Sequence, residues 1–96
     1  MVPDLSKIAG IGAYKTKKSE GRTVYYKDQS DKAFLVINGH TIEVRCDTKL
    51  SQHLEEVYES VMQSRYFGKG GIEIVPTNQL SPEELEDLIR LSYNLT

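Results

Sequence analysis

The sequence predicts an α+β two-layer sandwich: an antiparallel meander of four strands, a helix, a fifth strand and a final helix, with both long helices on one face of the sheet. Two observations predict this fold. An Asn-Gly pair separates two apolar, strand-like segments, and a helix-capping sequence precedes an apolar stripe near the C-terminus. The 96 residues contain no repeat or linker, so one domain is expected over residues 1–96.

The N-terminal third predicts a short helix and a hairpin. Residues 3–8 have room for one or two helical turns before Gly10 and Gly12 end any helix. Segments 14–18 and 23–27 carry Tyr, Thr and Val on either side of Ser-Glu-Gly. That composition is typical of two strands joined by a turn.

The Asn38-Gly39 pair marks the clearest turn in the chain. Both residues tolerate positive φ, so we expect a type I′ hairpin between residues 33–37 and 41–45. Apolar and charged residues alternate in the second of these strands, which places one face in the core and the other in water. The residues expected to be buried are Leu35, Ile42 and Val44, and those expected to be exposed are Glu43 and Arg45.

A helix is predicted next, with Asp47 or Thr48 as its N-cap and its end at about Met62 or Gln63. Its apolar stripe is formed by Leu50, Leu54, Val57, Tyr58 and Val61. Its solvated face is formed by Glu55, Glu56 and Glu59.

The last part of the chain predicts a strand, a turn and a capped helix. The strand over residues 72–75 stops at Pro76, which has no amide hydrogen for the ladder. A capping box then begins at Ser81, with Pro82 as the first helical residue and Glu84 reaching back to the cap. The apolar stripe of this helix is Leu85, Leu88, Ile89 and Ser92, widened by Leu91 and Leu95.

The residues between Ser64 and Tyr93 follow an order found in a known family. They are Ser64-Arg65, then Lys69, the strand, Leu88-Ile89 and finally Ser92-Tyr93. This order resembles the MmcQ/YjbR family of small bacterial proteins, and the resemblance covers about residues 32–96. Gly68, Gly71 and Ile72 stand where the family has Asn, His and Trp. The resemblance implies a layout like that of type III secretion chaperones and a function that is largely unassigned, with DNA binding inferred only from fold similarity.

Groups suited to catalysis or metal binding are sparse. His40, Cys46 and His53 do not have a zinc-ligand spacing, and the lone Cys46 ends an apolar alternation typical of a buried structural thiol. No pair of carboxylates stands out from the ordinary acidic helix faces. We therefore expect no enzymatic activity, no cofactor and no metal.

Residues 68–71 form a glycine-rich run around Lys69. A phosphate-binding loop leads from a strand into a helix, whereas this run is expected to follow a helix and enter a strand. Glycines at a helix C-cap and sheet entry, with Lys69 in water, explain it better.

Cations concentrate between residues 7 and 27, where Glu20 is the only acid, although the whole chain has a net charge of −2. Tyr14, Tyr25 and Tyr26 lie among them, a pattern typical of nucleic-acid contact. The plainer alternative is an edge hairpin that its lysines protect from aggregation. The residues expected to bind nucleic acid are Lys15, Lys17, Lys18, Arg22 and Lys27, joined by Arg65 and Lys69.

Two functions stay open. One is a nucleic-acid-binding module that uses the basic hairpin. The other is a protein or peptide adaptor, or chaperone-like module, favoured by overall acidity, exposed strand edges and the chaperone-like layout. The sequence has no apolar run of about 18 residues and no signal-peptide pattern at Met1–Leu5, so we expect a cytoplasmic protein without membrane contact.

Overall fold

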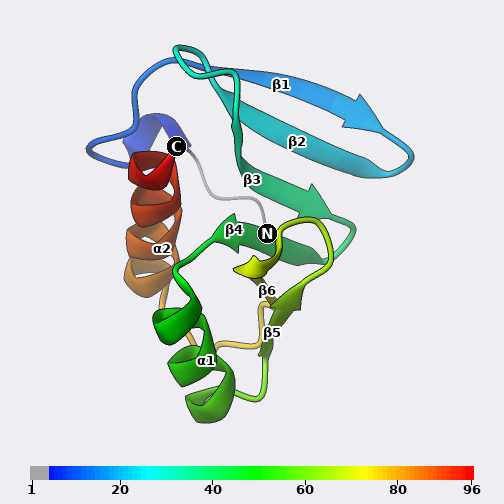
Figure 1. Cartoon of the computed structure of the whole chain (residues 1–96), viewed down its shortest axis with the longest axis vertical. Coiled ribbons are helices and arrows are strands. Elements are labelled where there is room, and N and C mark those ends of the chain that lie inside the picture. The colour runs from blue at the N-terminus through cyan, green and yellow to red at the C-terminus, as the bar shows by residue number, and fades with distance from the viewer. Residues whose placement is uncertain (1–4) are drawn as a thin grey trace.

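The computed structural model describes residues 5–96, which form a six-stranded antiparallel sheet with two α-helices on one face (Figure 1). In chain order the elements are η1 (Leu5–Lys7), β1 (Tyr14–Ser19), β2 (Arg22–Lys27), β3 (Ala33–Asn38), β4 (Thr41–Arg45), α1 (Thr48–Val57), β5 (Val61–Ser64), β6 (Gly68–Ile74) and α2 (Pro82–Leu95). The strand order across the sheet is β1-β2-β3-β4-β6-β5. The predicted α+β two-layer fold is confirmed, with one strand more than expected. Of the predicted N-terminal helix over residues 3–8, the part before Leu5 lies outside the described residues.

Two tight hairpins build the meander, and their turns differ. Glu20 and Gly21 join β1 to β2, and both have positive φ, 50° and 80°. That is the signature of a type I′ turn. The predicted type I′ turn at Asn38-Gly39 is wrong, because Asn38 pairs with Thr41 and the loop is Gly39 and His40. Gly39 has φ 62° and His40 does not have positive φ, so this turn has the pattern of type II′.

The core beneath the helices depends on a bulge in β3. Tyr25 of β2 pairs with Leu35 whereas Tyr26 pairs with Ala33, which leaves Phe34 as the extra residue. Phe34 and Leu35, although consecutive, therefore both enter this core. The predicted burial of Leu35, Ile42 and Val44 is confirmed.

Helix α1 is shorter than predicted. Its N-cap is Asp47, as expected, but Tyr58 is already extended at φ −119° and ψ 120°. Met62 and Gln63 lie in strand β5, and Val61 pairs with Ile74 of β6. The apolar spacing that predicted a longer helix has another cause. Val61 is buried as a residue of strand β5, and Val57, expected in the apolar stripe of the helix, is 55% exposed.

The glycine run is a strand rather than a helix C-cap. Residues 68–71 are the first part of β6, where Gly71 pairs with Arg45 of β4. A Cβ atom at Gly71 would lie 2.6 Å from the carbonyl oxygen of Val44 and 2.7 Å from the Phe67 side chain. Glycine is required there because the Val44 carbonyl and the Phe67 side chain leave no room for a Cβ atom.

Helix α2 confirms the capping box, with Ser81 and Glu84 each bonding the other's backbone N–H. Leu85, Ile89 and Ser92 are buried as expected, but Leu91 and Leu95 are 36% and 52% exposed. Tyr93 takes their place in the core, where its ring meets Phe34 edge-on at 5.0 Å. The Ser92 hydroxyl accepts the Arg45 N–H at 2.7 Å and donates to the Phe34 carbonyl at 2.5 Å, which joins α2 to β3 and β4.

Candidate functional site

The face of the sheet away from the helices, here called the open face, carries a second cluster of buried apolar side chains. Val24, Ala33 and Val36 form it, and Tyr26 and Phe67 pack against it. Partners across a β-ladder point to the same side of the sheet. Side chains opposite members of this cluster therefore belong to the open face.

Two arginines lie on rings of this face. The Arg22 guanidinium is 5.3 Å from the Tyr66 ring centroid, and that of Arg45 is 4.9 Å from the Phe67 centroid. Arg45 also donates from Nε to the Ala33 carbonyl at 2.6 Å, so it is half-buried rather than exposed as predicted. Within residues 5–96 neither arginine forms an ion pair, so their charges are available to an anionic ligand.

The two rings come from the turn between β5 and β6. Tyr66 and Phe67 meet edge-on at 5.0 Å, and Tyr66 remains 38% exposed. Burial, and then a hydrogen bond with Tyr26, raise the pKa of Tyr66, while Arg22 and Arg45 oppose the shift. We call the group formed by these residues the arginine–tyrosine cluster: Arg22, Tyr26, Arg45, Tyr66 and Phe67.

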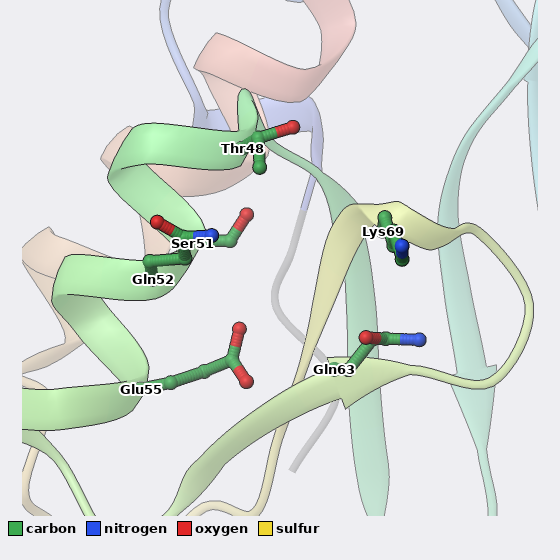
Figure 2. A pocket seen from close by; sticks show the side chains of 6 residues that line it. All are labelled: Thr48, Ser51, Gln52, Glu55, Gln63 and Lys69. Carbon is green, nitrogen blue, oxygen red and sulfur yellow. The ribbon is translucent and has the colours of Figure 1, made fainter.

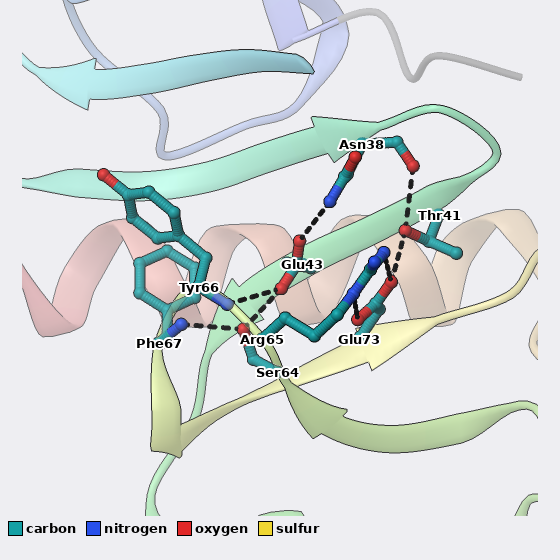
Figure 3. Close-up of polar contacts among 8 residues, drawn as sticks. All are labelled: Asn38, Thr41, Glu43, Ser64, Arg65, Tyr66, Phe67 and Glu73. Carbon is teal, nitrogen blue, oxygen red and sulfur yellow. Dashed lines mark hydrogen bonds and ion pairs between the residues drawn. The ribbon is translucent and has the colours of Figure 1, made fainter. Parts of the chain in front are cut away.

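Two buried carboxylates lie beneath this turn (Figure 3). Glu43 and Glu73 are opposite each other on β4 and β6 and are 0% and 2% exposed. The predicted exposure of Glu43 is therefore wrong. The cause is a chain segment more than twenty residues away: the turn after Ser64 folds over the open face and supplies hydrogen-bond donors to this carboxylate.

Each carboxylate has its own set of donors. Glu43 accepts from the Ser64 hydroxyl at 2.7 Å and the Tyr66 N–H at 2.9 Å. Glu73 accepts from Arg65 at 2.9 Å and 2.6 Å and from the Thr41 hydroxyl at 2.6 Å. The bond from Arg65 is the main cause that lowers the pKa of Glu73 and raises that of Arg65.

The structure brings together only part of the predicted nucleic-acid site. Lys17 and Lys15 pair with Val24 and Tyr26, so both belong to the open face with Arg22. Lys17 forms no ion pair within the described part of the chain, whereas Lys15 is 3.2 Å from Asp31.

The other predicted cations of the hairpin lie on the helix side. Lys18 pairs with Thr23, on the helix side of the sheet. Lys27 lies 4.5 Å from the Tyr93 ring centroid and donates to the Tyr93 carbonyl, also on the helix side. Arg65 lies on the open face, in the turn over Glu43 and Glu73, but its guanidinium is paired with Glu73. Lys18 and Lys27 do not form one surface with Lys17.

Lys69 borders a separate polar pocket between α1 and the β5–β6 hairpin (Figure 2). Thr48, Ser51, Gln52, Glu55 and Gln63 are its other lining residues. Glu55 supplies a negative charge on the opposite wall, so the pocket has no net preference for anions. The structure thus separates Lys69 from the basic hairpin.

The candidate metal ligands stay apart. His40 is exposed in the β3–β4 turn and His53 is exposed on α1, while Cys46 is buried. Burial is the largest of the causes that raise the pKa of the Cys46 thiol. Among residues 5–96 no three His, Cys, Asp or Glu side chains are grouped as metal ligands would be. In the same range, neither helix has the length and apolar character needed to cross a bilayer.

Sequence reasoning missed the residues that complete the site: Arg45, Tyr66, Phe67, Glu43 and Glu73. The available signal was a single acid between apolar neighbours in each of two strands, Ile42-Glu43-Val44 and Ile72-Glu73-Ile74. Such alternation is usually read as a solvated face. Two acids in adjacent strands, with Ser-Arg in the hairpin turn, were a reason to expect a buried polar network instead.

Comparison with known proteins gives a fold but no named activity. No protein-family model matches the chain, and no curated protein matches it. The crystal structure of Deinococcus radiodurans protein DR2400, described as a DUF419 domain, is similar to it with a TM-score of 0.79. The match has 13% identical residues and covers 94% of this chain and 72% of that one. The chain therefore has the fold of a DUF419 domain, and its resemblance to the MmcQ/YjbR family, which agrees with that fold, remains a prediction from the sequence.

Proposed function

We propose that this protein binds single-stranded nucleic acid on the open face of its sheet. The observation that carries the proposal is the arginine–tyrosine cluster, in which Arg22 lies on the ring of Tyr66 without an acidic partner in residues 5–96. Lys17 extends the same face onto the edge strand β1. Cations that contact phosphates beside rings or guanidinium planes that stack on bases are the usual components of such sites.

The distribution of charge removes the main objection to the proposal, the net charge of −2. The exposed acids of the helices, such as Glu55 and Asp87, belong to the layer on the other side of the sheet, and Glu43 and Glu73 are buried. A backbone phosphate on the open face is thus separated from most of the negative charge by the sheet itself. Surface charges more than about 10 Å apart are largely screened at 0.1 M salt.

Single strands fit this face better than a duplex. The exposed part of the Tyr66 ring and the guanidinium of Arg22 offer stacking surfaces, which only unpaired bases can use. No described helix lies on this face to enter a major groove, since both α1 and α2 cover the other face. We therefore expect single-stranded oligonucleotides to bind more tightly than a duplex of the same sequence.

Neighbouring lysines of β1 provide a matched test. Lys17→Glu places an acid on the open face, whereas Lys18→Glu makes the same charge change on the helix side. Fluorescence anisotropy with a labelled oligothymidine at about 50 mM salt, where phosphate contacts are strong, should show weaker binding for Lys17→Glu than for Lys18→Glu. Equal losses would mean that binding follows only net charge and would reject the open face as the site.

A second candidate function is peptide binding by strand addition. All six residues of β1 are exposed, and β1 is an edge of the sheet. An extended peptide that added to this edge would protect β1 amides from hydrogen exchange. Oligonucleotide binding to the open face would not do so, which separates the two functions.

A further inference from the structure

The turn that carries Tyr66 is held by the two buried carboxylates. Glu43 receives the Tyr66 N–H and the Ser64 hydroxyl, and the same hydroxyl oxygen accepts the Phe67 N–H at 2.8 Å. Arg65 reaches Glu73 with two nitrogens. Every residue of the turn is thereby connected to Glu43 or Glu73 (Figure 3).

Two adjacent buried carboxylates are an unfavourable way to stabilise a fold. Like charges directly opposite each other on adjacent strands repel. Within residues 5–96 only one guanidinium, that of Arg65, pairs with either acid, and its partner is Glu73. Apolar side chains of similar size at such a position are often equally stabilising. What an apolar side chain cannot supply is an acceptor for the Tyr66 N–H, which fixes the backbone that carries the ring.

We infer that Glu43 and Glu73 are positioning residues that hold the turn 65–67 so that the Tyr66 ring lies against Arg22 and remains partly exposed on the open face. Arg65 is then a tie between the turn and the sheet rather than a phosphate contact. The role of this positioning in binding rests on the proposed function. The position of the Tyr66 ring against Arg22 can be tested without any ligand.

The ligand-free test uses the ring current of Tyr66. Arg22 side-chain protons beside this ring should resonate upfield of exposed arginine protons, and Glu43→Leu should return them toward ordinary values. Glu43→Gln keeps an acceptor oxygen for the Tyr66 N–H and should restore most of the upfield shift. Glu56→Gln, which neutralises an exposed acid on α1, is the control and should change nothing. Upfield Arg22 protons that persist in a folded Glu43→Leu variant would overturn the positioning role.

A double-mutant cycle tests the role in binding. Glu43→Leu should weaken oligothymidine binding about fivefold or more, the least that one lost base stack is worth. In a Tyr66→Leu background the same change should have little further effect, because Glu43 acts through the ring. If Glu43→Leu weakened binding by the same factor in both backgrounds, the change would instead indicate a general effect on the fold. If Glu43→Leu does not fold, Glu73→Gln takes its place in the same cycle.

The salt dependence of Kd shows whether Arg65 holds the turn to the sheet or contacts a phosphate. Arg22→Gln should reduce the slope of log Kd against log salt by about 0.7, the value for one phosphate contact on a single strand. Arg65→Gln should weaken binding and leave the slope unchanged; a slope reduced as in Arg22→Gln would overturn the assignment of Arg65. Absence of binding by the wild type would reject the proposed function, while the ring-current result would still decide the positioning role.

Discussion

Two buried serine hydroxyls of this domain, those of Ser92 and Ser60, differ in their hydrogen bonds. Its hydroxyl is fully buried and bonds one backbone group of β3 and one of β4. Both groups lie beneath α2, so the loss of this oxygen would leave them unpaired in the core. Ser60 is also buried, but its hydroxyl has no hydrogen-bond partner among the described residues.

Replacement of each serine by alanine should therefore have different effects on stability. Ser92→Ala should lower the free energy of unfolding by about 1–3 kcal/mol, the cost of leaving buried groups unsatisfied. Ser60→Ala, the matched control, should change it by less than about 0.5 kcal/mol, because no hydrogen bond is lost. Urea denaturation followed by circular dichroism measures both, and equal effects would refute the role assigned to Ser92.

Glu73 makes the fold sensitive to acid. Arg65 holds the pKa of Glu73 below its ordinary value of 4.5. A carboxylate whose pKa is lower in the folded state stabilises the protein above its unfolded pKa, and that stabilisation is lost as the pH falls through the folded pKa.

The wild type should thus exceed Glu73→Gln in stability at neutral pH, and the difference should shrink as the pH falls below about 4. Free energies of unfolding for both proteins between neutral and acidic pH provide the measurement. A constant difference over that range would mean that the ionised carboxylate contributes nothing.

Among the elements, the hairpin and the helix cap that depend on residues close together in the chain were predicted from the sequence. The hairpin around Glu20 and the capping box at Ser81 involve contacts between residues close in the chain, and both are present. The end of α1 is different, because the apolar spacing through Val61 suits a helix as well as a strand. The β6 partner of Val61, Ile74, lies 13 residues further along and decides between them.

The candidate site was predictable only in part, for the same reason. Lys17 and Arg22 were found as members of a cation cluster on one hairpin. Arg45 and Tyr66 join them through the sheet and the turn over it, which brings together residues from three distant segments. Charge counts along the chain do not reveal which face a lysine occupies, and so Lys18 and Lys27, which lie on the helix side, were grouped with Lys17.

Two glycines of β6 test how tightly the β5–β6 turn packs on the sheet. Gly71→Ala should destabilise the fold by about 2 kcal/mol or more, because the new Cβ overlaps the Val44 carbonyl and the Phe67 side chain. Gly70→Ala, whose Cβ would meet its nearest neighbour, the Phe67 carbonyl, at 3.7 Å, should be tolerated. Thermal unfolding compares them, and a Gly71→Ala protein as stable as Gly70→Ala would contradict the packing of Phe67 on β6.

The whole molecule separates its surfaces by charge and chemistry. Both helices, with their exposed acids, cover one face of the sheet, and the other face carries unpaired arginines beside rings within the described residues. A fold of this size has room for one core beneath the helices and a thinner cluster on the open face. That second face is where a ligand has access to both rings and cations.

An NMR titration of the protein with a short oligothymidine at about 50 mM salt tests the central claim most directly. The amide resonances of Lys17, Arg22 and Tyr66 should shift, while those on the outer surface of α1, such as Glu56, should stay fixed. The shifts should diminish as salt is added, because phosphate contacts release counterions. Fixed resonances across residues 14–27 and 65–67, or shifts confined to α1 and α2, would contradict nucleic-acid binding on the open face.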